Sequence, residues 1–372
     1  MTPEKSQPIA FFLLFLDGGG AERVVVTLAN TLVDLANRPI HVVLAERKGP
    51  LLHELRPEVK IVDLCSGNEL KAIFTLSKYL RKHSPAILMS SMKNVNVLAI
   101  IASLIARRPS RLVIREANVL LCSQEKYLQR IRTKILVYLM RGLYRFADAI
   151  IINSEATKLS LEQQNIKLPE AYVISNPIEI KRTSKENCKC NFPTPYICSV
   201  GRLKNQKGHE TLLEAFALLP EKDLHLVILG EGELRHDLES RAASLQISNR
   251  VHMPGFIKNP FSILERAEAF VLASRWEGFG NVIVEALSLG LPVVCTDCPG
   301  APRFILENGK HGHLVPVDQP QALADAIMQA LTAPAGTPAS RKARAADFDA
   351  EKICKEYLYK VLIPSSSKKE GD

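Results

Sequence analysis

Two cationic side chains in the second half of the chain have the spacing that a diphosphate-binding loop would need. Arg202 and Lys207 lie five residues apart in the segment Gly201–Gly208, which reads GRLKNQKG. An arginine offers phosphate oxygens a fork of hydrogen-bond donors, and a lysine offers a compact positive charge, so the pair could bind a diphosphate. A solvated basic loop has the same composition, and composition alone favours neither interpretation.

Two glutamates, Glu277 and Glu285, supply carboxylates further along the chain, in the stretch SRWEGFGNVIVEAL. Carboxylates that hydrolyse a glycosidic bond lie about 5–10 Å apart, whereas eight residues along a helix span about 12 Å. The spacing therefore favours carboxylates that accept hydrogen bonds from hydroxyl groups at opposite ends of an extended ligand. The apolar neighbours Val284, Ala286 and Leu287 argue against Glu285 being a plain surface residue.

Two glycine turns could add backbone donors to such a site. Gly18–Gly20 follows an apolar run in the first half of the chain, and Gly230–Gly232 follows one in the second half. Glycine lets backbone N–H groups approach a ligand closely, although many glycine turns only end a strand. Neither turn reads G-x-G-x-x-G or continues into G-K-[ST], so the dinucleotide and P-loop patterns are absent.

The elements that position these residues are short apolar runs alternating with amphipathic stretches. Strands are expected at Ile9–Leu16, Ile40–Ala45, Ile61–Leu64, Ala86–Ser90, Arg111–Ile114, Ala149–Asn153, Tyr196–Val200, Leu224–Leu229, Ala269–Leu272, Pro292–Thr296 and Gly312–Val315. Helices are expected between them, including Glu22–Ala36, Glu210–Leu219 and Leu234–Leu245. This alternation predicts an α/β protein with two Rossmann-like, doubly wound domains facing a cleft. Ligands of such sheets bind outside the carboxyl ends of the strands.

The alternation of strands and helices breaks at Ser175–Pro195, which contains three prolines and little periodicity. We therefore expect an N-terminal domain at 1–178, a linker at 179–195 and a C-terminal domain at 196–346. Within the latter, 333–346 is expected to be a loop. A last helix at 347–363 is expected to pack back on the N-terminal domain, and 364–372 to be a disordered tail.

The net charge of +9 is concentrated in the first half of the chain. Residues 1–178 hold 24 Lys and Arg against 15 Asp and Glu, and the rest of the chain is balanced. Within the helical stretch after Gln124, four cations fall in an arc of about 60°: Arg130, Lys134, Arg141 and Arg145. The apolar residues Leu128, Ile131, Ile135, Leu139, Leu143 and Phe146 lie on the other side. The local excess of charge predicts a surface on the first domain for an anionic membrane, with an ordinary solvated helix as the alternative.

Other classes of protein fit less well. A nucleic-acid-binding protein would explain the basic half but not the two glutamates, and no helix-turn-helix, RNP or zinc-finger pattern is present.

No apolar run reaches the length of about 20 residues that a membrane span needs. The run Ile9–Leu16 ends in Asp17 and three glycines rather than at a signal-peptide cleavage site, so we expect a cytoplasmic protein. The lone C-x-x-C pair, Cys295 and Cys298, predicts reduced thiols rather than a zinc site.

In their order and spacing the motifs resemble the family 4 retaining glycosyltransferases of the GT-B fold, of the type that builds bacterial polysaccharides and lipid-linked oligosaccharides. The resemblance covers most of the chain. Its motifs are GGGAE at 18–22, NSE at 153–155, SNPI at 175–178, GRLKNQKG at 201–208, the turn at 230–232, the two glutamates at 277 and 285, and GLPVV at 290–294.

The resemblance implies a role for each site residue. Arg202 and Lys207 would neutralise the diphosphate of a nucleotide-sugar donor, Glu285 would hold the ribose and Glu277 the hexose, with Glu277, Arg202 and Lys207 as the catalytic set. The implied donor-binding residues are Gly18, Gly19, Gly20, Gly201, Arg202, Lys207, Gly230, Glu231, Phe279, Gly280, Asn281 and Glu285. Arg115, Glu116 and Asn118 are the candidates for acceptor binding, at a place where relatives often carry a histidine that this chain lacks.

The resemblance also implies the chemistry and its partners. Neither a metal nor a cofactor is expected, because fixed cations and helix ends would take up the charge of the leaving group; Asp347-Phe348-Asp349, the only D-x-D, is interpreted as structural. Retention would follow front-face attack, with the donor phosphate accepting the acceptor's proton. The donor is expected to be a UDP-sugar, especially a UDP-N-acetylhexosamine, with GDP-mannose next. The acceptor would be a glycan or a polyprenyl-diphosphate-linked glycan at the inner face of the cytoplasmic membrane. A nucleotide-sugar epimerase on the same fold and a non-enzymatic anion-binding protein remain the alternatives.

Overall fold

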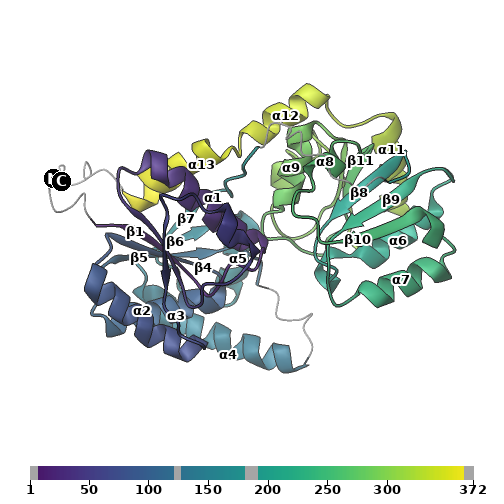
Figure 1. Cartoon of the computed structure of the whole chain (residues 1–372). Helices are drawn as coiled ribbons and strands as arrows, with labels where there is room; N and C mark the ends of the chain where they lie inside the picture. Colours follow the sequence, from purple (N-terminus) through teal and green to yellow (C-terminus); the bar gives the residue numbers. More distant parts are fainter. Residues whose placement is uncertain (1–6, 121–126, 181–191, 364–372) are drawn as a thin grey trace. The chain divides into compact units, whose positions relative to one another are not determined.

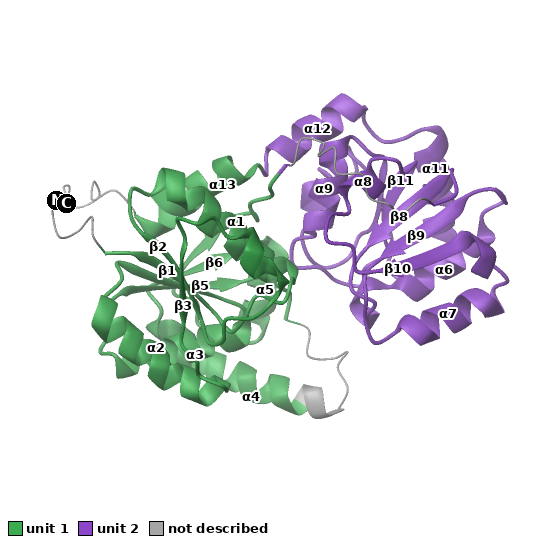
Figure 2. Cartoon of the chain, in the orientation of Figure 1, with its two compact units in different colours: residues 1–179, 349–372 green, residues 180–348 purple. Residues whose placement is uncertain are grey.

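The computed structural model describes residues 7–120, 127–180 and 192–363, and the side chains of 127–130 lie outside that description. The chain forms two compact units (Figure 2): unit 1 contains Met1–Glu179 and Asp349–Asp372, and unit 2 contains Ile180–Phe348. Most of the expected linker and the expected disordered tail fall outside the described residues. Each unit has its own parallel sheet.

The sheet of unit 1 has the strand order β3-β2-β1-β4-β5-β6-β7, and all neighbouring strands are parallel. Its strands are β1 (Ile9–Leu13), β2 (Ile40–Leu44), β3 (Lys60–Asp63), β4 (Ile87–Ser91), β5 (Arg111–Glu116), β6 (Ala149–Ile152) and β7 (Glu170–Val173). The inner strands are continuous apolar runs such as IAFFL and AIII, buried along their whole length. Such runs are typical of a parallel sheet that helices cover on both faces.

Helices cover the two faces of this sheet with separate cores (Figure 1). On one face lie α2 (Glu69–His83), α3 (Lys93–Ile105), α4 (Tyr127–Leu143) and the short η3 (Tyr144–Phe146). On the other face lie α1 (Gly20–Leu35) and the C-terminal α13 (Ala350–Glu356), which continues as the π-helical turn η6 (Tyr357–Leu362). The remaining elements are η2 (Pro50–Glu54) and α5 (Glu155–Gln163). The last helical segment therefore belongs to the core of unit 1, although it comes at the end of the chain.

The sheet of unit 2 repeats the same winding, with the order β10-β9-β8-β11-β12-β13 and parallel pairing throughout. Its strands are β8 (Tyr196–Val200), β9 (His225–Leu229), β10 (Val251–Gly255), β11 (Ala269–Leu272), β12 (Val293–Thr296) and β13 (His313–Val315). In both units the first strand lies at the centre, and the chain then builds the sheet outward on one side before it crosses to the other. The expected α/β fold class with two Rossmann-like sheets is confirmed.

The helices of unit 2 also form two layers. A core on one face of the sheet contains residues of α6 (His209–Leu218), α7 (Arg235–Ser244) and α11 (Pro320–Thr332). Helix α9 (Asn281–Leu289) packs against α12 (Pro338–Ala346) and against β11 and β12. The shorter elements are η4 (Asn205–Lys207), η5 (Ser248–Arg250), α8 (Phe261–Leu264) and α10 (Pro302–Ile305). Among the described residues, no helix is both long enough and apolar enough to cross a bilayer.

One expectation about the elements is wrong. Residues 333–346 were expected to be a loop, but Pro338–Ala346 forms helix α12. Thr337 and Ser340 cap its start reciprocally, and Pro338 occupies the first turn, where a missing N–H costs nothing. The buried Arg341 donates to the carbonyl of Gly290 at 2.9 Å, which fixes the helix beside α9. Two edge strands, β7 and β10, were also not anticipated.

Candidate functional site

The predicted diphosphate loop connects the central strand β8 to helix α6. The loop turns sharply at Gly208, whose φ is +60°, and a Cβ there would lie 2.0 Å from the carbonyl oxygen of Ala273. The aliphatic part of Lys207 packs over Gly201, because a Cβ added to Gly201 would lie 3.1 Å from Lys207 Cδ. Both glycines therefore allow the loop to fold tightly against the end of β11, and the tight fold fixes the direction of the Lys207 side chain.

Lys207 and Glu277 come together although 70 residues separate them in the sequence. Lys207 Nζ lies 2.6 Å from Glu277 Oε1, and the two side chains are only 16% and 7% exposed. The hydroxyl of Ser274 donates to the same carboxylate oxygen at 2.6 Å. The strands that carry these residues, β8 and β11, are neighbours at the point where the strand order reverses. In open α/β sheets, that point at the carboxyl ends of the strands is where ligands bind.

The backbone of Glu277 is fixed by the loop after β12. Its amide donates to the carbonyl of Pro299 at 2.9 Å. A Cβ at Gly300 would lie 2.3 Å from the carbonyl oxygen of Glu277, so the two loops touch through their backbones. Since the carboxylate, the amide and the carbonyl are all constrained, Glu277 is a preorganised group rather than a mobile surface acid.

Arg202 stands apart from this ion pair. Its side chain is exposed, as is that of Lys204 in the same loop. Arg275, by contrast, is used to hold the loop in place: it donates to the carbonyl of Asn205 at 2.9 Å and pairs with Asp318 at 2.9 Å. The structure therefore leaves Arg202 accessible to an anion at the carboxyl end of β8.

The turn after β9 braces the diphosphate loop from the side. A Cβ at Gly230 would lie 2.0 Å from the carbonyl oxygen of Gly201, and the amide of Leu203 donates to the carbonyl of Glu231 at 2.9 Å. The carboxylate of Glu231 is paired with Arg235 at 2.6 Å, and these hydrogen bonds lower the pKa of the Glu231 carboxyl. Glu231 thus contributes backbone support, with its side chain occupied by Arg235.

Helix α9 begins next to Glu277 with its first amides uncapped by any side chain. Its N-cap is Gly280, at φ +96°, and the helix starts at the half-buried Asn281. The ring of Phe279 is buried against Phe348 at a centroid distance of 5.5 Å, so only its backbone remains for a ligand. Glu285 lies further along the same helix and is half-buried. A helix start that lacks a side-chain cap leaves N–H donors and positive potential for an anion.

Neutral groups fill the space below the ion pair. His209, the first residue of α6, is buried, and burial lowers the pKa of its imidazole to about 4. Both of its ring nitrogens lack a hydrogen-bond partner among the described residues. Burial raises the pKa of the Cys295 thiol, and raises that of Cys298 to about 12, so both remain protonated beside Glu277 and Lys207. Within the described ranges, His, Cys, Asp and Glu side chains form no cluster that could hold a metal.

The predicted acceptor residues are placed differently from the expectation. Arg115 is fully buried in unit 1, where its guanidinium donates to Ser91 Oγ at 3.0 Å, to the Tyr357 hydroxyl at 3.1 Å and to Asn176. Glu116 is also buried, and it accepts hydrogen bonds from the side chains of Asn96 (2.8 Å) and Tyr144. Burial raises the pKa of the Glu116 carboxyl. Asn118 is the one of the three that is exposed. Arg115 and Glu116 therefore stabilise unit 1 and do not face a ligand in this conformation.

The glycine turn of unit 1 lies between β1 and α1. Gly18 has φ +93°, Gly19 is the N-cap of α1, and Gly20 is its first residue, with no side chain capping the helix. This turn lies at the carboxyl end of the central strand, as the diphosphate loop does in unit 2. Its predicted contact with a donor phosphate stays a prediction.

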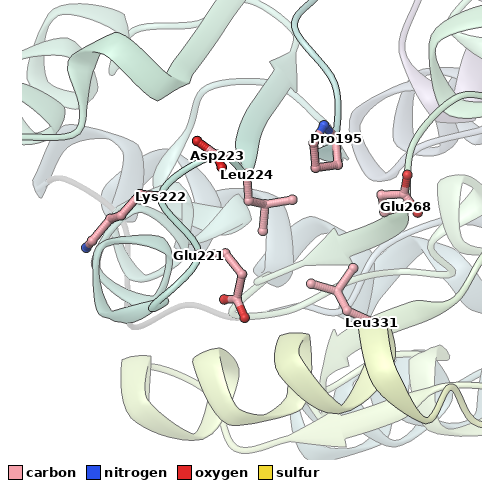
Figure 3. A pocket seen from close by; sticks show the side chains of 7 residues that line it. All are labelled: Pro195, Glu221, Lys222, Asp223, Leu224, Glu268 and Leu331. Atoms are coloured by element: carbon pink, nitrogen blue, oxygen red, sulfur yellow. The ribbon is translucent and has the colours of Figure 1, made fainter.

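A surface hollow of about 350 Å³ lies in unit 2 (Figure 3). Its lining residues precede β8, β9 and β11 or lie on α11, and are Pro195, Glu221, Lys222, Asp223, Leu224, Glu268 and Leu331. These positions mark the amino ends of the strands, opposite to the edge that carries Lys207 and Glu277. None of the predicted donor residues lines this hollow, so it is not the candidate site.

Two groups that shape the site were not predicted from the sequence. Ser274 holds the Glu277 carboxylate, and Gln206 donates to the carbonyl of Trp276 at 2.9 Å. The serine could have been suspected, because a hydroxyl three residues before an acid at a strand end can reach it. The Gln206 contact links segments 70 residues apart, and no local pattern indicates it.

Comparisons with known proteins identify the family. The model described as Glycosyltransferase Family 4 matches residues 18–182, and the model described as Glycosyl transferases group 1 matches residues 182–347. The chain is 30% identical over 372 residues to the N-acetylgalactosamine-N,N'-diacetylbacillosaminyl-diphospho-undecaprenol 4-alpha-N-acetylgalactosaminyltransferase of Campylobacter jejuni, covering 96% of this chain and all of that protein. It is 29% identical over 343 residues to an uncharacterized glycosyltransferase of Methanocaldococcus jannaschii, covering 79% of this chain and 83% of the relative.

Solved structures show the same fold at lower identity. HepE of Anabaena in complex with UDP and glucose matches with a TM-score of 0.78 and 22% identity, over 95% of this chain and 99% of that one. Sucrose-phosphate synthase of Thermosynechococcus elongatus matches with a TM-score of 0.81 and 21% identity, over 97% and 100%. The motifs, the two repeated sheets and these relatives agree, and the chain belongs to the family 4 glycosyltransferases of the GT-B fold, with relatives that build bacterial polysaccharides.

Proposed function

We propose that this glycosyltransferase moves an N-acetylhexosamine or hexose, with retention of configuration and without a metal ion, from a UDP-sugar to a lipid-linked glycan. The observation that carries the proposal is the Lys207–Glu277 ion pair at the strand reversal of unit 2, flanked by the exposed Arg202 and the uncapped start of α9. This arrangement offers positive charge to a diphosphate and a fixed carboxylate to the sugar attached to it.

Each charged group has a separate task in this proposal. Arg202, Lys207 and the first amides of α9 neutralise the charge that grows on the departing nucleoside diphosphate. Glu277, held by Ser274, accepts hydrogen bonds from hexose hydroxyls, and Glu285 accepts them from the ribose. The donor phosphate takes the proton of the acceptor, so no side chain is assigned as a general base. Since fixed cations balance the leaving group, the reaction as proposed uses no metal.

The choice of donor and acceptor is supported by the relatives. The Campylobacter jejuni relative is named as an N-acetylgalactosaminyltransferase acting on a diphospho-undecaprenol glycan, and the Anabaena structure holds UDP. We therefore take UDP-N-acetylgalactosamine as the first donor to test and a polyprenyl-diphosphate-linked glycan as the acceptor class. An acceptor of this kind, together with the basic first half of the chain, supports a location on the inner face of the cytoplasmic membrane.

Calorimetric titration of UDP into variants of the diphosphate loop tests the donor site. Arg202→Ala removes charge-assisted hydrogen bonds worth about 1.5–3 kcal/mol, so UDP should bind about 10- to 150-fold more weakly. Lys204→Ala is the matched control: the residue is an exposed cation in the same loop, and its loss should change the affinity less than about threefold. Equal weakening by the two variants would mean a diffuse charge effect and would contradict the assigned site.

Glu277→Gln tests the sugar side of the same site. The amide oxygen of glutamine can still accept hydrogen bonds from Lys207 and Ser274, so the site should keep its geometry. Unit 2 should lose some stability, because Lys207 loses its counter-charge, so transfer is compared at a temperature where both proteins are folded. Hydrogen bonds from sugar hydroxyls to a charged acceptor are weakened, and transfer from UDP-N-acetylgalactosamine should fall by about 100-fold or more. Transfer at the wild-type rate would remove Glu277 from the catalytic set.

A further inference from the structure

Large apolar side chains lie on the outer face of α4, in unit 1. The exposed fractions are 40% for Ile131, 58% for Ile135, 74% for Tyr138 and 38% for Leu139. The residues that face the core of unit 1 are instead Thr133, Val137 and Met140, followed in η3 by Tyr144. Ile131, Ile135 and Leu139 were expected on the side of the helix opposite the cations. In the structure these three side chains are exposed, whereas Leu143 and Phe146 from the same side pack partly against the core.

The exposed apolar residues form one stripe with cations along its edges. At 100° per residue, the four side chains span an arc of about 100°, centred opposite to the buried ones. Lys134 and Arg141 lie along one edge of the stripe and Arg132 along the other, and all three are exposed. Arg145, in η3, is exposed as well, whereas the side chain of Arg130 lies outside the described residues. The sequence from 126 to 147 contains no acidic residue.

An apolar stripe between two rows of cations matches the surface of an anionic bilayer. A helix that lies in the plane of the interface buries its apolar side among the acyl chains, while its cations meet the lipid phosphates. We propose that the outer face of α4, made of Ile131, Ile135, Tyr138 and Leu139 with Arg132, Lys134, Arg141 and Arg145, binds the anionic phospholipid surface of the membrane. This proposal deepens the proposed function, because it names the contact that would hold unit 1 at a lipid-borne acceptor. It rests on the proposed function only for its biological setting.

A second group of exposed apolar and basic side chains lies on α2. Helices α2 and α3 lie on the same face of the sheet (Figure 1), and α3 packs against both α2 and α4. On α2, Leu70 is 73% exposed and Phe74 is 60% exposed, and the cations Lys71 and Lys78 lie beside them on the surface. Exposed apolar and basic side chains therefore occur together on α2 as well as on α4.

Two other occupants suit the α4 face less well. A second copy of the chain, packed α4 against α4, would bring together cations from both copies without an acid on either helix. Such like-charge contacts oppose association. A nucleic acid would use the cations, but branched aliphatic side chains such as Ile131 and Ile135 neither stack on bases nor bind phosphates. The apolar stripe is what favours lipid.

Co-sedimentation of the full chain with vesicles tests the proposal without donor, acceptor or turnover. Binding is expected to phosphatidylcholine vesicles that contain phosphatidylglycerol, and not to phosphatidylcholine alone. High salt should weaken it, because the Debye length falls from about 10 Å at 0.1 M to about 3 Å at 1 M. Lys134→Glu should weaken binding at least about fivefold, and Ile135→Glu at least about tenfold. The matched controls in unit 2, Lys222→Glu and Leu218→Glu, replace an exposed cation and a 51%-exposed leucine and should bind as the wild type does.

A fluorescent probe reports whether the α4 face itself enters the lipid. In Tyr138→Trp, the emission of the new indole should shift to the blue on binding and should be quenched by brominated acyl chains, relative to the wild type with its single Trp276. Calorimetric UDP affinity should be the same in all α4 variants, so a failure of the donor site and a failure of the membrane contact are distinguishable.

Three results would overturn the proposal. Vesicle binding that is unchanged in both Lys134→Glu and Ile135→Glu would place the membrane contact elsewhere. Lack of vesicle binding, together with a wild-type dimer that the same variants dissociate, would make the α4 face a self-association surface. Binding to single-stranded RNA that the vesicles cannot compete away, with no shift in the Tyr138→Trp emission, would assign the cations to nucleic acid.

Discussion

Because Lys207 and Glu277 form an ion pair, removing the charge of either residue affects both the stability of unit 2 and the proposed donor site. Both side chains are largely buried, so removing one charge leaves the other with an uncompensated desolvation cost. In the proposed donor complex, Lys207 would contact a phosphate oxygen in addition to, or in place of, the carboxylate. A loss of activity in Lys207→Ala alone would therefore mix two effects. Arg202→Ala avoids this because Arg202 lies outside the ion pair, and Glu277→Gln reduces it because the amide oxygen keeps the hydrogen bonds from Lys207 and Ser274.

Buried His209 makes unit 2 sensitive to acid. Its pKa is lowered to about 4 by burial, below the ordinary value of 6.5 that it regains on unfolding. Between these values the unfolded chain binds more protons at His209 than the native one does, so the contribution of His209 to stability falls as the pH drops from 6.5 to 4. Below pH 4 this contribution changes no further. A shift of this size corresponds to about 3 kcal/mol. In His209→Gln that part of the pH dependence should disappear from the denaturant-unfolding free energy of unit 2.

His236→Gln is the control for this prediction, because the His236 side chain is 95% exposed in the same unit. Its pH profile should follow that of the wild type between pH 4 and 6.5. An unchanged profile in His209→Gln would show that His209 is protonated, or solvated, in the native state.

The sequence predicted where single charged residues lie relative to the strands, but not which residues they contact. Arg202, Lys207 and Glu277 were expected at strand ends because their types and spacing suit a diphosphate and a sugar. The ion pair between Lys207 and Glu277 depends on β8 and β11 being neighbours, which the order of the sequence does not state. Arg115 was a candidate for acceptor binding because it lies where relatives often carry a histidine. The structure buries it instead, with a hydrogen bond to Tyr357, 242 residues away.

Strands and helices with many apolar residues were predicted correctly, whereas elements with few apolar residues, such as α12, were not. Buried strands such as β1 and β11 are continuous apolar runs, so the sequence shows them directly. Helix α12 reads PASRKARAA and has no large apolar side chain. Its small alanines let it approach α9, and Arg341 donates both to the carbonyl of Gly290 at the end of α9 and to that of Ala335 in the turn before α12. The strand β10 contains Pro254 and lies at the sheet edge, where proline is tolerated.

Gly208 is an element-scale test of how tightly the diphosphate loop is built. In Gly208→Ala the new Cβ would lie 2.0 Å from the carbonyl oxygen of Ala273, so backbone must move. Strain at positive φ adds about 1 kcal/mol, and displacement of packed backbone adds a further 1–3 kcal/mol. We expect a loss of about 2–4 kcal/mol in the unfolding free energy of unit 2, together with weaker UDP binding.

Gly67→Ala is the control that separates backbone strain at positive φ from a steric clash of the new Cβ. Gly67 has nearly the same φ, +67°, but a Cβ there would meet nothing within 4 Å. The unfolding free energy should then fall only by the strain of about 1 kcal/mol, and the affinity for UDP should not change. Equal losses of stability in Gly208→Ala and Gly67→Ala would show that the loop after β8 can rearrange at little cost and therefore does not fix Lys207.

The last segment of the chain completes unit 1, the unit that the chain begins with. After unit 2 ends at Phe348, residues from Asp349 onward rejoin unit 1, where Asp349 pairs with Ile178 and α13 packs on α1. The sequence predicts this last helix from its periodicity. The same amphipathic pattern would suit either sheet, so the observed partner depends on the fit of particular side chains, chiefly Tyr357 with Arg115.

Replacing Tyr357 should therefore destabilise unit 1 alone. Tyr357 is fully buried in the core below α1, and its hydroxyl accepts a hydrogen bond from Arg115 at 3.1 Å. Tyr357→Ala should lower the unfolding free energy of unit 1 by about 3–5 kcal/mol, the usual loss for a large aromatic side chain in a core. Tyr359→Ala, two residues on, removes a side chain that is 63% exposed, and should cost less than about 0.5 kcal/mol.

Differential scanning calorimetry measures the effect for each unit if the two unfold separately. The transition of unit 1 should move to lower temperature in Tyr357→Ala, while the transition that UDP stabilises should stay in place, because the proposed donor residues of the diphosphate loop and α9 belong to unit 2. Intermediate destabilisation in Tyr357→Phe would isolate the share of the Arg115 hydrogen bond. An equal shift of both transitions in Tyr357→Ala would mean that the returning segment stabilises the two units together, against the division at Phe348 and Asp349 that the structure shows.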